Sequence, residues 1–109
     1  MALKFLAASG SGDIADALTA FYYAVENGAD VISNSWGGGG FSQATQDIIN
    51  YAYSQGVMIV ASAGNDGANY PQYPGFYDNM LSVAATDSLD AMCTGRWAAP
   101  VGCTCVTSS

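Results

Sequence analysis

The sequence predicts an α/β fold, a partial doubly wound parallel sheet of about four strands joined by two crossover helices. Short β-branched apolar runs bounded by glycine are typical of buried parallel strands, and residues 57–61 form the clearest one. Two segments between such runs repeat apolar residues at helical spacing. Because strands and helices alternate along the chain, the strands should be parallel.

The first half of the chain predicts one strand and one helix. Residues 2–8 are expected to form the first strand, and a Ser-Gly-Ser-Gly turn follows them. Asp13 can then cap a helix whose apolar residues recur at helical spacing. The dipeptide Asn27-Gly28 should end this helix.

The second half predicts three more strands around one helix. Residues 30–36 are expected to form the second strand, the run 57–61 the third and residues 80–86 the fourth. Ser42 can cap the helix between the second and third strands, and Gly56 should end it.

This order implies that one face of the sheet has no helices. Right-handed crossovers between neighbouring strands place both helices on the same face. Strands as apolar as these normally need cover on both faces. We therefore expect a fold that lacks one helix layer and that can self-associate through its bare sheet face.

The amino-acid composition argues against several classes of function. Only 10% of the residues are charged, the net charge is −7, and Lys4 and Arg96 are the only basic residues, which disfavours nucleic-acid binding. No apolar run approaches the roughly 18 residues of a membrane span. Residues 1–8 resemble a signal peptide weakly, but a strand is preferred because a turn and a helix follow directly. The chain contains no histidine, the commonest general base and metal ligand.

The last part of the chain differs from the rest. Residues 88–109 hold all three cysteines and show neither strand nor helix periodicity, so we expect an irregular, divergent tail after a domain of residues 1–87. An odd number of cysteines without metal-type spacing predicts neither a disulfide framework nor a zinc site.

Small residues follow two neighbouring strands of the predicted sheet, at Ser35, Trp36 and Gly37 and again at Ala63 and Gly64, with Trp36 the one large side chain. Ligands of parallel sheets bind beyond the carboxyl ends of the strands, so two such walls would form a slot for an extended peptide or a side chain. Ser35 could be read as a nucleophile, but without histidine it lacks the ordinary activating base.

A second binding motif competes with this interpretation. Residues 10–15 fit the G-x-G-x-x-A pattern of dinucleotide-binding proteins. However, Asp30 precedes the next strand, whereas the ribose-binding acid should follow it, and Asp13 would repel a pyrophosphate. A flexible strand-to-helix turn explains the glycines better, and a nucleotide-binding domain remains the third hypothesis.

Four segments together resemble the subtilisin-like serine proteases, also called subtilases or peptidase family S8. They are Asn-Gly-Ala-Asp-Val-Ile-Ser-Asn-Ser-Trp-Gly-Gly at 27–38, Ala-Ser-Ala-Gly-Asn-Asp-Gly at 61–67, Tyr-Pro-Gly-Phe-Tyr at 73–77 and Leu-Ser-Val-Ala-Ala-Thr-Asp at 81–87. The resemblance implies the three-layer subtilisin fold, a polypeptide substrate and a mostly secreted parent family of endopeptidases.

The resemblance also implies site residues. Asn65 would be the oxyanion-hole donor, with its amide aimed at the charge that develops in the tetrahedral intermediate. The other positions would pair with the substrate backbone, or form the walls and floor of the specificity pocket: Gly10, Ser11, Gly12, Ser35, Trp36, Gly37, Ala63, Gly64, Tyr73, Pro74 and Gly75. In many members of the family the Tyr–Pro bond is cis.

The family's catalytic motifs are not recognisable here. Its catalytic Asp and His precede the part that this chain resembles, and its nucleophile motif follows it. We therefore expect the substrate-binding centre of a subtilase without the Asp/His/Ser triad, inactive alone; the alternative is a non-catalytic peptide-binding module. We expect no cofactor. Some relatives hold a weak cation near the carbonyls that match Gly75, Tyr77 and Met80, but carboxylate partners cannot be placed, so calcium is not assigned.

Overall fold

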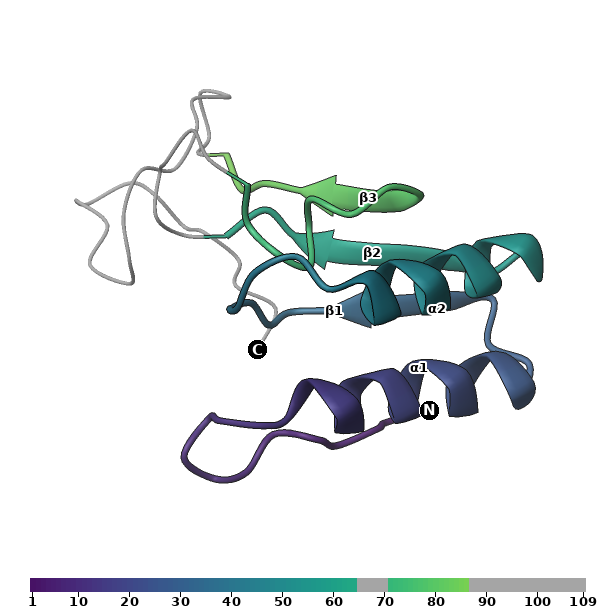
Figure 1. Ribbon diagram of the computed structural model, residues 1–109, viewed down its shortest axis with the longest axis horizontal. Helices are drawn as coiled ribbons and strands as arrows, with labels where there is room; N and C mark the ends of the chain where they lie inside the picture. The colour runs from purple at the N-terminus through teal and green to yellow at the C-terminus, as the bar shows by residue number, and fades with distance from the viewer. Residues whose placement is uncertain (65–70, 87–109) are drawn as a thin grey trace.

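The computed structural model describes residues 1–64 and 71–86 and contains two helices and three strands in these ranges (Figure 1). The elements along the chain are α1 (Ile14–Glu26), β1 (Val31–Asn34), α2 (Gln43–Ser54), β2 (Met58–Ser62) and β3 (Met80–Val83). Two sequence-based expectations, the oxyanion role of Asn65 and the irregular tail of residues 88–109, lie outside the described residues.

Both helices begin and end where the sequence predicts. The Asp13 side chain accepts a hydrogen bond from the backbone N–H of Ala15 at 2.8 Å and caps α1. Ser42 caps α2 in the same way. Gly28 and Gly56 follow the two helices with φ of 77° and 79°, a conformation that glycine adopts without a steric penalty.

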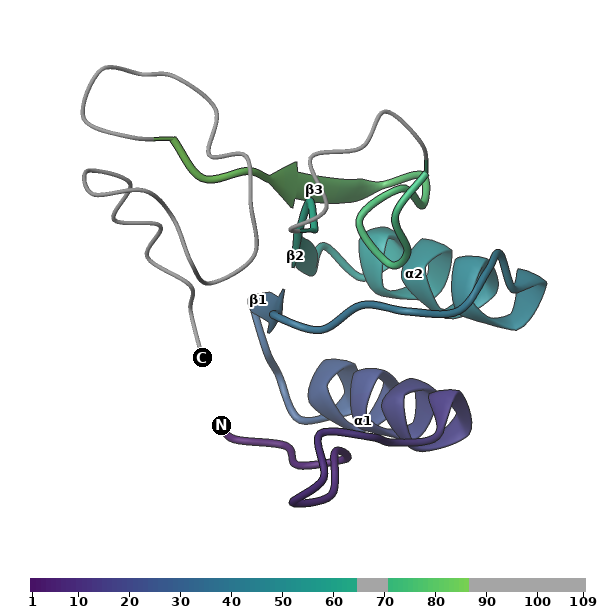
Figure 2. The ribbon, with the colours of Figure 1, turned by 90° about the vertical axis from the view of Figure 1, so that its left-hand side faces the viewer.

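The three strands are parallel and lie in the order β1-β2-β3. Figure 2 shows α1 and α2 on the same side of this sheet. Strand residues that point to that side, such as Ile59 and Ala61, are buried at 1% and 2% exposure. The core lies between the sheet and the helices and is built from Phe21, Ile49, Ala52, Val57, Ile59 and Tyr77.

The opposite face of the sheet carries exposed apolar side chains, as the sequence predicts. Because side chains alternate along a strand, the paired residues Val31 and Met58 point away from the helices, and so do Leu81 and Val83. Each of these four side chains is between 50% and 56% exposed.

Residues 2–8 do not form the predicted first strand; in the described residues β1 pairs only with β2. This segment is held by a turn and by side chains. The Ala7 N–H donates to the Ser11 carbonyl at 2.9 Å, and the Gly10 N–H to the Ala7 carbonyl at 2.9 Å. The Phe5 ring contacts Trp36 edge-on at 5.2 Å. The segment lies beside α1 and does not join the sheet (Figure 2).

The two helices contact each other through aromatic rings near their C-terminal ends. Tyr22 of α1 stacks on Tyr51 of α2 with 5.8 Å between ring centroids. The Tyr51 hydroxyl donates to the Glu26 carboxylate, and this hydrogen bond raises the pKa of Tyr51 because ionisation would remove the donor. These side chains fix how α1 lies against α2.

We expect Thr45→Val to raise the free energy of unfolding by about 1 kcal/mol, because an unsatisfied buried hydroxyl costs roughly that or more. Thr45 is 0% exposed, and in the described part of the chain its Oγ1 atom has no hydrogen-bond partner. Thr19→Val is the matched control, since the Thr19 hydroxyl donates to the Ala15 carbonyl at 2.9 Å on an exposed helix surface. Urea denaturation of both variants checks this; equal effects would contradict it.

We expect the chain to self-associate through the bare face, and Leu81→Lys to weaken this association roughly 10- to 100-fold, since burying one Leu contributes about 1.5–3 kcal/mol. Sedimentation velocity over a concentration series measures it. Tyr53→Lys, at a side chain 61% exposed on α2, adds the same charge on the helix side and should leave the association unchanged. A monomer at all concentrations would contradict the expectation.

Candidate substrate-binding site

Three segments meet beyond the carboxyl ends of the strands: residues 35–38 after β1, residues 63–64 after β2, and residues 72–75 before β3 (Figure 1). The Gly38 N–H donates to the Tyr73 carbonyl at 3.1 Å, which joins the first segment to the third. The sheet ladder continues past β2, where the Ala63 N–H donates to the Val83 carbonyl at 2.9 Å. Parallel strands bring the ends of β1 and β2 to one edge. Residues 72–75 precede β3, and the contact of Gly38 with Tyr73 places them at this same edge.

Glycine permits the close approach of these segments. A Cβ atom on Gly75 would lie 2.7 Å from the Ser62 carbonyl oxygen, which is closer than atoms can pack. A Cβ on Gly37 would lie 3.3 Å from the Tyr73 carbonyl oxygen. Gly64 has a φ of 93° and lies against the Gln72 side chain. At Gly37 and Gly75 backbone therefore meets backbone, whereas Gly64 meets a side chain.

The segment that starts at Tyr73 has two buried residues, Pro74 and Tyr77. The Tyr73–Pro74 bond is cis, as the resemblance implied, and Pro74 is fully buried. The Tyr77 N–H donates to the Pro74 carbonyl at 3.1 Å and closes the turn. The rings of Tyr73 and Tyr77 pack with 4.7 Å between centroids, and Phe41 contacts both.

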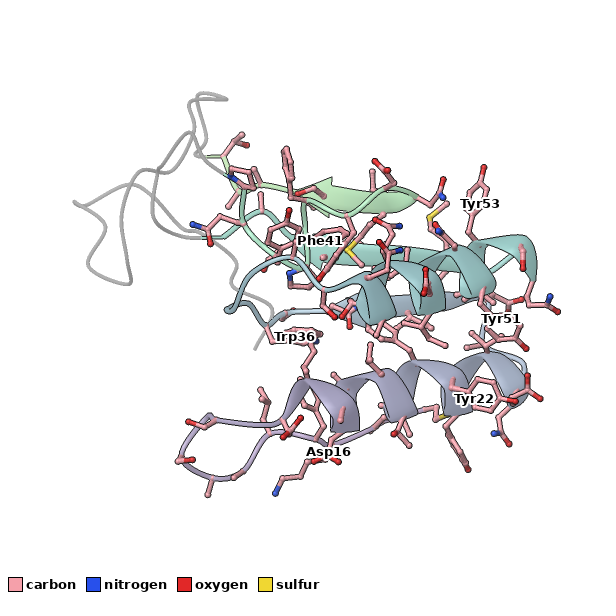
Figure 3. The ribbon with its side chains drawn as sticks, in the orientation of Figure 1. Asp16, Tyr22, Trp36, Phe41, Tyr51 and Tyr53 are labelled. Carbon is pink, nitrogen blue, oxygen red and sulfur yellow. The ribbon has the colours of Figure 1, made fainter. Side chains whose placement is uncertain are left out.

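Trp36 has its backbone at the strand ends, but its ring lies between β1 and α1 (Figure 3). The indole N–H donates to Oδ1 of Asn34 at 3.2 Å. The Asn34 amide in turn donates to the Val60 carbonyl at 3.1 Å, which ties the side chain to β2. The Trp36 ring therefore packs against the helix layer (Figure 3).

Gly10, Ser11 and Gly12 lie in an exposed turn before α1. A Cβ on Gly12 would lie 2.9 Å from the Phe5 carbonyl oxygen and 2.9 Å from Leu6 Cδ2, so this turn packs on its own N-terminal segment. In the described residues its link to the other segments passes through the contact of Phe5 with Trp36.

A pocket of about 700 Å³ lies on the other side of β1, between the N-terminal segment, α1 and the strand. Met1, Leu3 and Phe5 line it at every second position, which is the spacing of an extended chain. This pocket lies where the first predicted strand, residues 2–8, was expected beside β1, and of the predicted site residues it includes only Trp36.

Sequence patterns did not reveal two residues that shape the site. Gln72 packs against Gly64, and Phe41 packs against the aromatic turn. Both lie in irregular segments, where neither strand nor helix periodicity identifies which side chains make contacts. Within residues 1–64 and 71–86, no three His, Cys, Asp or Glu side chains are grouped as ligands of a metal ion. None of the helices in the described ranges is long and apolar enough to cross a membrane.

The family model for the subtilase family matches residues 1–107. The chain belongs to the subtilase family. This match includes most of residues 88–109, the part expected from the sequence to diverge. The α/β architecture described above is therefore a subtilisin-like fold.

Known relatives of this subtilase segment are considerably longer. It is 41% identical to thermitase of Thermoactinomyces vulgaris over 90 residues, which cover 83% of this chain and 32% of thermitase. It is 38% identical to the minor extracellular protease Epr of Bacillus subtilis over 87 residues, 79% of this chain and 14% of that protein. The structure superposes on a lanthipeptide protease with a TM-score of 0.76 and 25% identity, over 83% of this chain and 32% of that one.

We expect Gly75→Ala to lower the free energy of unfolding by about 1–3 kcal/mol, because the added methyl must displace the Ser62 backbone. Gly40→Ala is the matched control, since a Cβ there meets nothing within 4 Å. Thermal and urea denaturation measure both variants. If the Gly75 variant were as stable as the Gly40 variant, the close approach of the two segments would be wrong.

Proposed function

We propose that this chain forms the substrate-binding part of a subtilisin-like serine endopeptidase domain, and that alone it binds extended peptides without cleaving them. The observation that carries the proposal is the convergence of Gly37, Gly64 and Gly75 at one sheet edge. Backbone without side chains can pair with the backbone of a peptide, as in β-augmentation.

The proposed lack of hydrolysis rests on the sequence. It contains no histidine, so no serine of this chain, Ser35 included, has the imidazole base of a Ser-His-Asp triad. Asn65 would contribute the oxyanion-hole amide within a complete domain. The chain spans about a third of thermitase, which leaves room for the triad in other segments of a domain of that kind.

A non-catalytic peptide-binding module is the second candidate, and the absence of histidine favours it. Both candidates use the same cleft and a polypeptide partner. They differ in whether the segment works inside an enzyme. Neither requires a cofactor. A secreted location is proposed for the parent protein, supported by the extracellular protease among the relatives.

We expect the 109-residue chain to bind a fluorescein-labelled hexapeptide of alanines with one phenylalanine, with a Kd in the micromolar range by fluorescence anisotropy. Mass spectrometry should recover the peptide intact after a day, and a fluorophosphonate should label no serine. Cleavage that the fluorophosphonate inhibits would contradict the proposal, and so would a failure to bind the peptide.

A chimera separates the two candidates. Replacing the matching 90 residues of thermitase with those of this chain should give an enzyme that hydrolyses peptides. Asn65→Ala in the chimera should lower kcat by roughly 10²- to 10³-fold, the loss known for such a donor in a subtilisin itself. A folded chimera that binds peptides but does not cleave them would favour the non-catalytic module.

A further inference from the structure

One side chain of α2 is hydrogen-bonded to the backbone of the turn that follows Tyr73, Pro74 and Gly75, the residues that the family resemblance places at the floor of the substrate-binding cleft. We propose that Gln46 is a positioning residue that holds the floor segment, residues 73–78, in its peptide-binding geometry. This inference rests on the proposed function, because it names a residue that shapes the same site.

The Gln46 amide makes a two-point contact with one residue of the turn. The Asp78 N–H donates to Gln46 Oε1 at 3.1 Å, and Gln46 Nε2 donates to the Asp78 carbonyl at 3.2 Å. Gln46 is only 8% exposed, so water competes weakly for these bonds. A primary amide carries both a donor and an acceptor, which a carboxylate or an ammonium group does not.

Further hydrogen bonds attach the residues on both sides of Asp78 to α2. The second Gln46 Nε2 bond goes to Asn50 Oδ1 at 3.0 Å, and the same oxygen accepts from the Asn79 amide at 3.0 Å. Near the start of α2, the Ser42 N–H donates to the Tyr77 hydroxyl oxygen at 2.9 Å. Three consecutive residues, 77–79, are thus fixed to one face of α2.

A hydrogen-bonded turn connects residues 77–79 to the residues at the sheet edge. The Tyr77 N–H bond to the Pro74 carbonyl joins the fixed residues to the floor. On the other side of this turn lie Gly75, against the Ser62 carbonyl, and the Tyr73 carbonyl, bonded to Gly38. Without the Gln46 amide, the Asp78 backbone would lose both of its bonds to α2, and only the contacts of Tyr77 and Asn79 would remain. More of the turn would then have to be ordered when the peptide binds.

The test compares Gln46→Met with two controls in the full 109-residue chain. Gln43→Met removes a similar helix-surface amide, which bonds only Asp47 at 2.8 Å among the contacts described. Ile49→Val lowers stability from the core, at a residue 0% exposed, and removes no hydrogen bond between α2 and the turn. Hydrogen exchange of the Asp78 amide reports the attachment, and anisotropy with the labelled hexapeptide reports the cleft.

We expect Gln46→Met to speed exchange of the Asp78 amide by about tenfold or more, the loss of roughly one hydrogen bond, and to weaken peptide binding by about 3- to 10-fold. Both controls should keep the Asp78 exchange rate and the peptide affinity. Unchanged exchange in Gln46→Met would overturn the attachment, and faster exchange with unchanged affinity would overturn the positioning role. An affinity loss as large in Ile49→Val would also overturn it, since the effect would then follow stability alone.

The two proposals fail in different ways. If the unsubstituted chain binds no peptide, the proposed function is wrong and Gln46 has no site to position. The exchange rate of the Asp78 amide still shows in that case whether Gln46 holds the turn.

Discussion

The right-handed crossover between the parallel strands β1 and β2 decides on which face of the sheet the core forms. The crossover from β1 through α2 to β2 places α2 on one face of the sheet. α1 packs against α2 on that same face (Figure 2). The core therefore forms on that face alone, and the other face keeps half-exposed apolar side chains. The same arrangement brings all three carboxyl ends to one edge, where the candidate site lies.

At that edge the structure depends on backbone rather than on large side chains. Glycines let the segments after β1 and β2 approach the segment before β3 so closely that a methyl group would not fit at Gly75. A surface of this kind is suited to pairing with another extended backbone. The Gln46 amide and the Tyr77 hydroxyl bond the turn before β3 to α2 and its N-cap, and we propose that these bonds hold the shape of the surface.

Membership of the subtilase family is consistent with the absence of histidine from this chain. A subtilase segment that spans about a third of thermitase contains the strands that would contact a peptide, and its sequence holds no histidine to activate a serine. A low content of charge fits a segment with more apolar surface than its own two helices cover. The same physical features thus account for an expected binding cleft, an expected lack of cleavage and an expected tendency to associate.

The sequence by itself determined the elements whose signals are local. Asp13 and Ser42 mark helix starts, Gly28 and Gly56 follow helix ends, and β-branched runs mark the strands, because capping and periodicity depend on near neighbours. Residues 2–8 carry a strand-like pattern, yet only tertiary contacts decided that they pack beside α1.

The candidate site likewise has some features that the sequence predicts and others that only the tertiary structure shows. Linked motifs were enough to locate the strand ends and the Tyr-Pro-Gly turn, since their small residues and spacing are visible along the chain. Only the tertiary structure decided that the Trp36 ring turns toward α1 and that Gln46 bonds Asp78, 32 residues away. An amide on a helix can bond solvent or a distant backbone equally well, and the packing of the turn on α2 makes that choice.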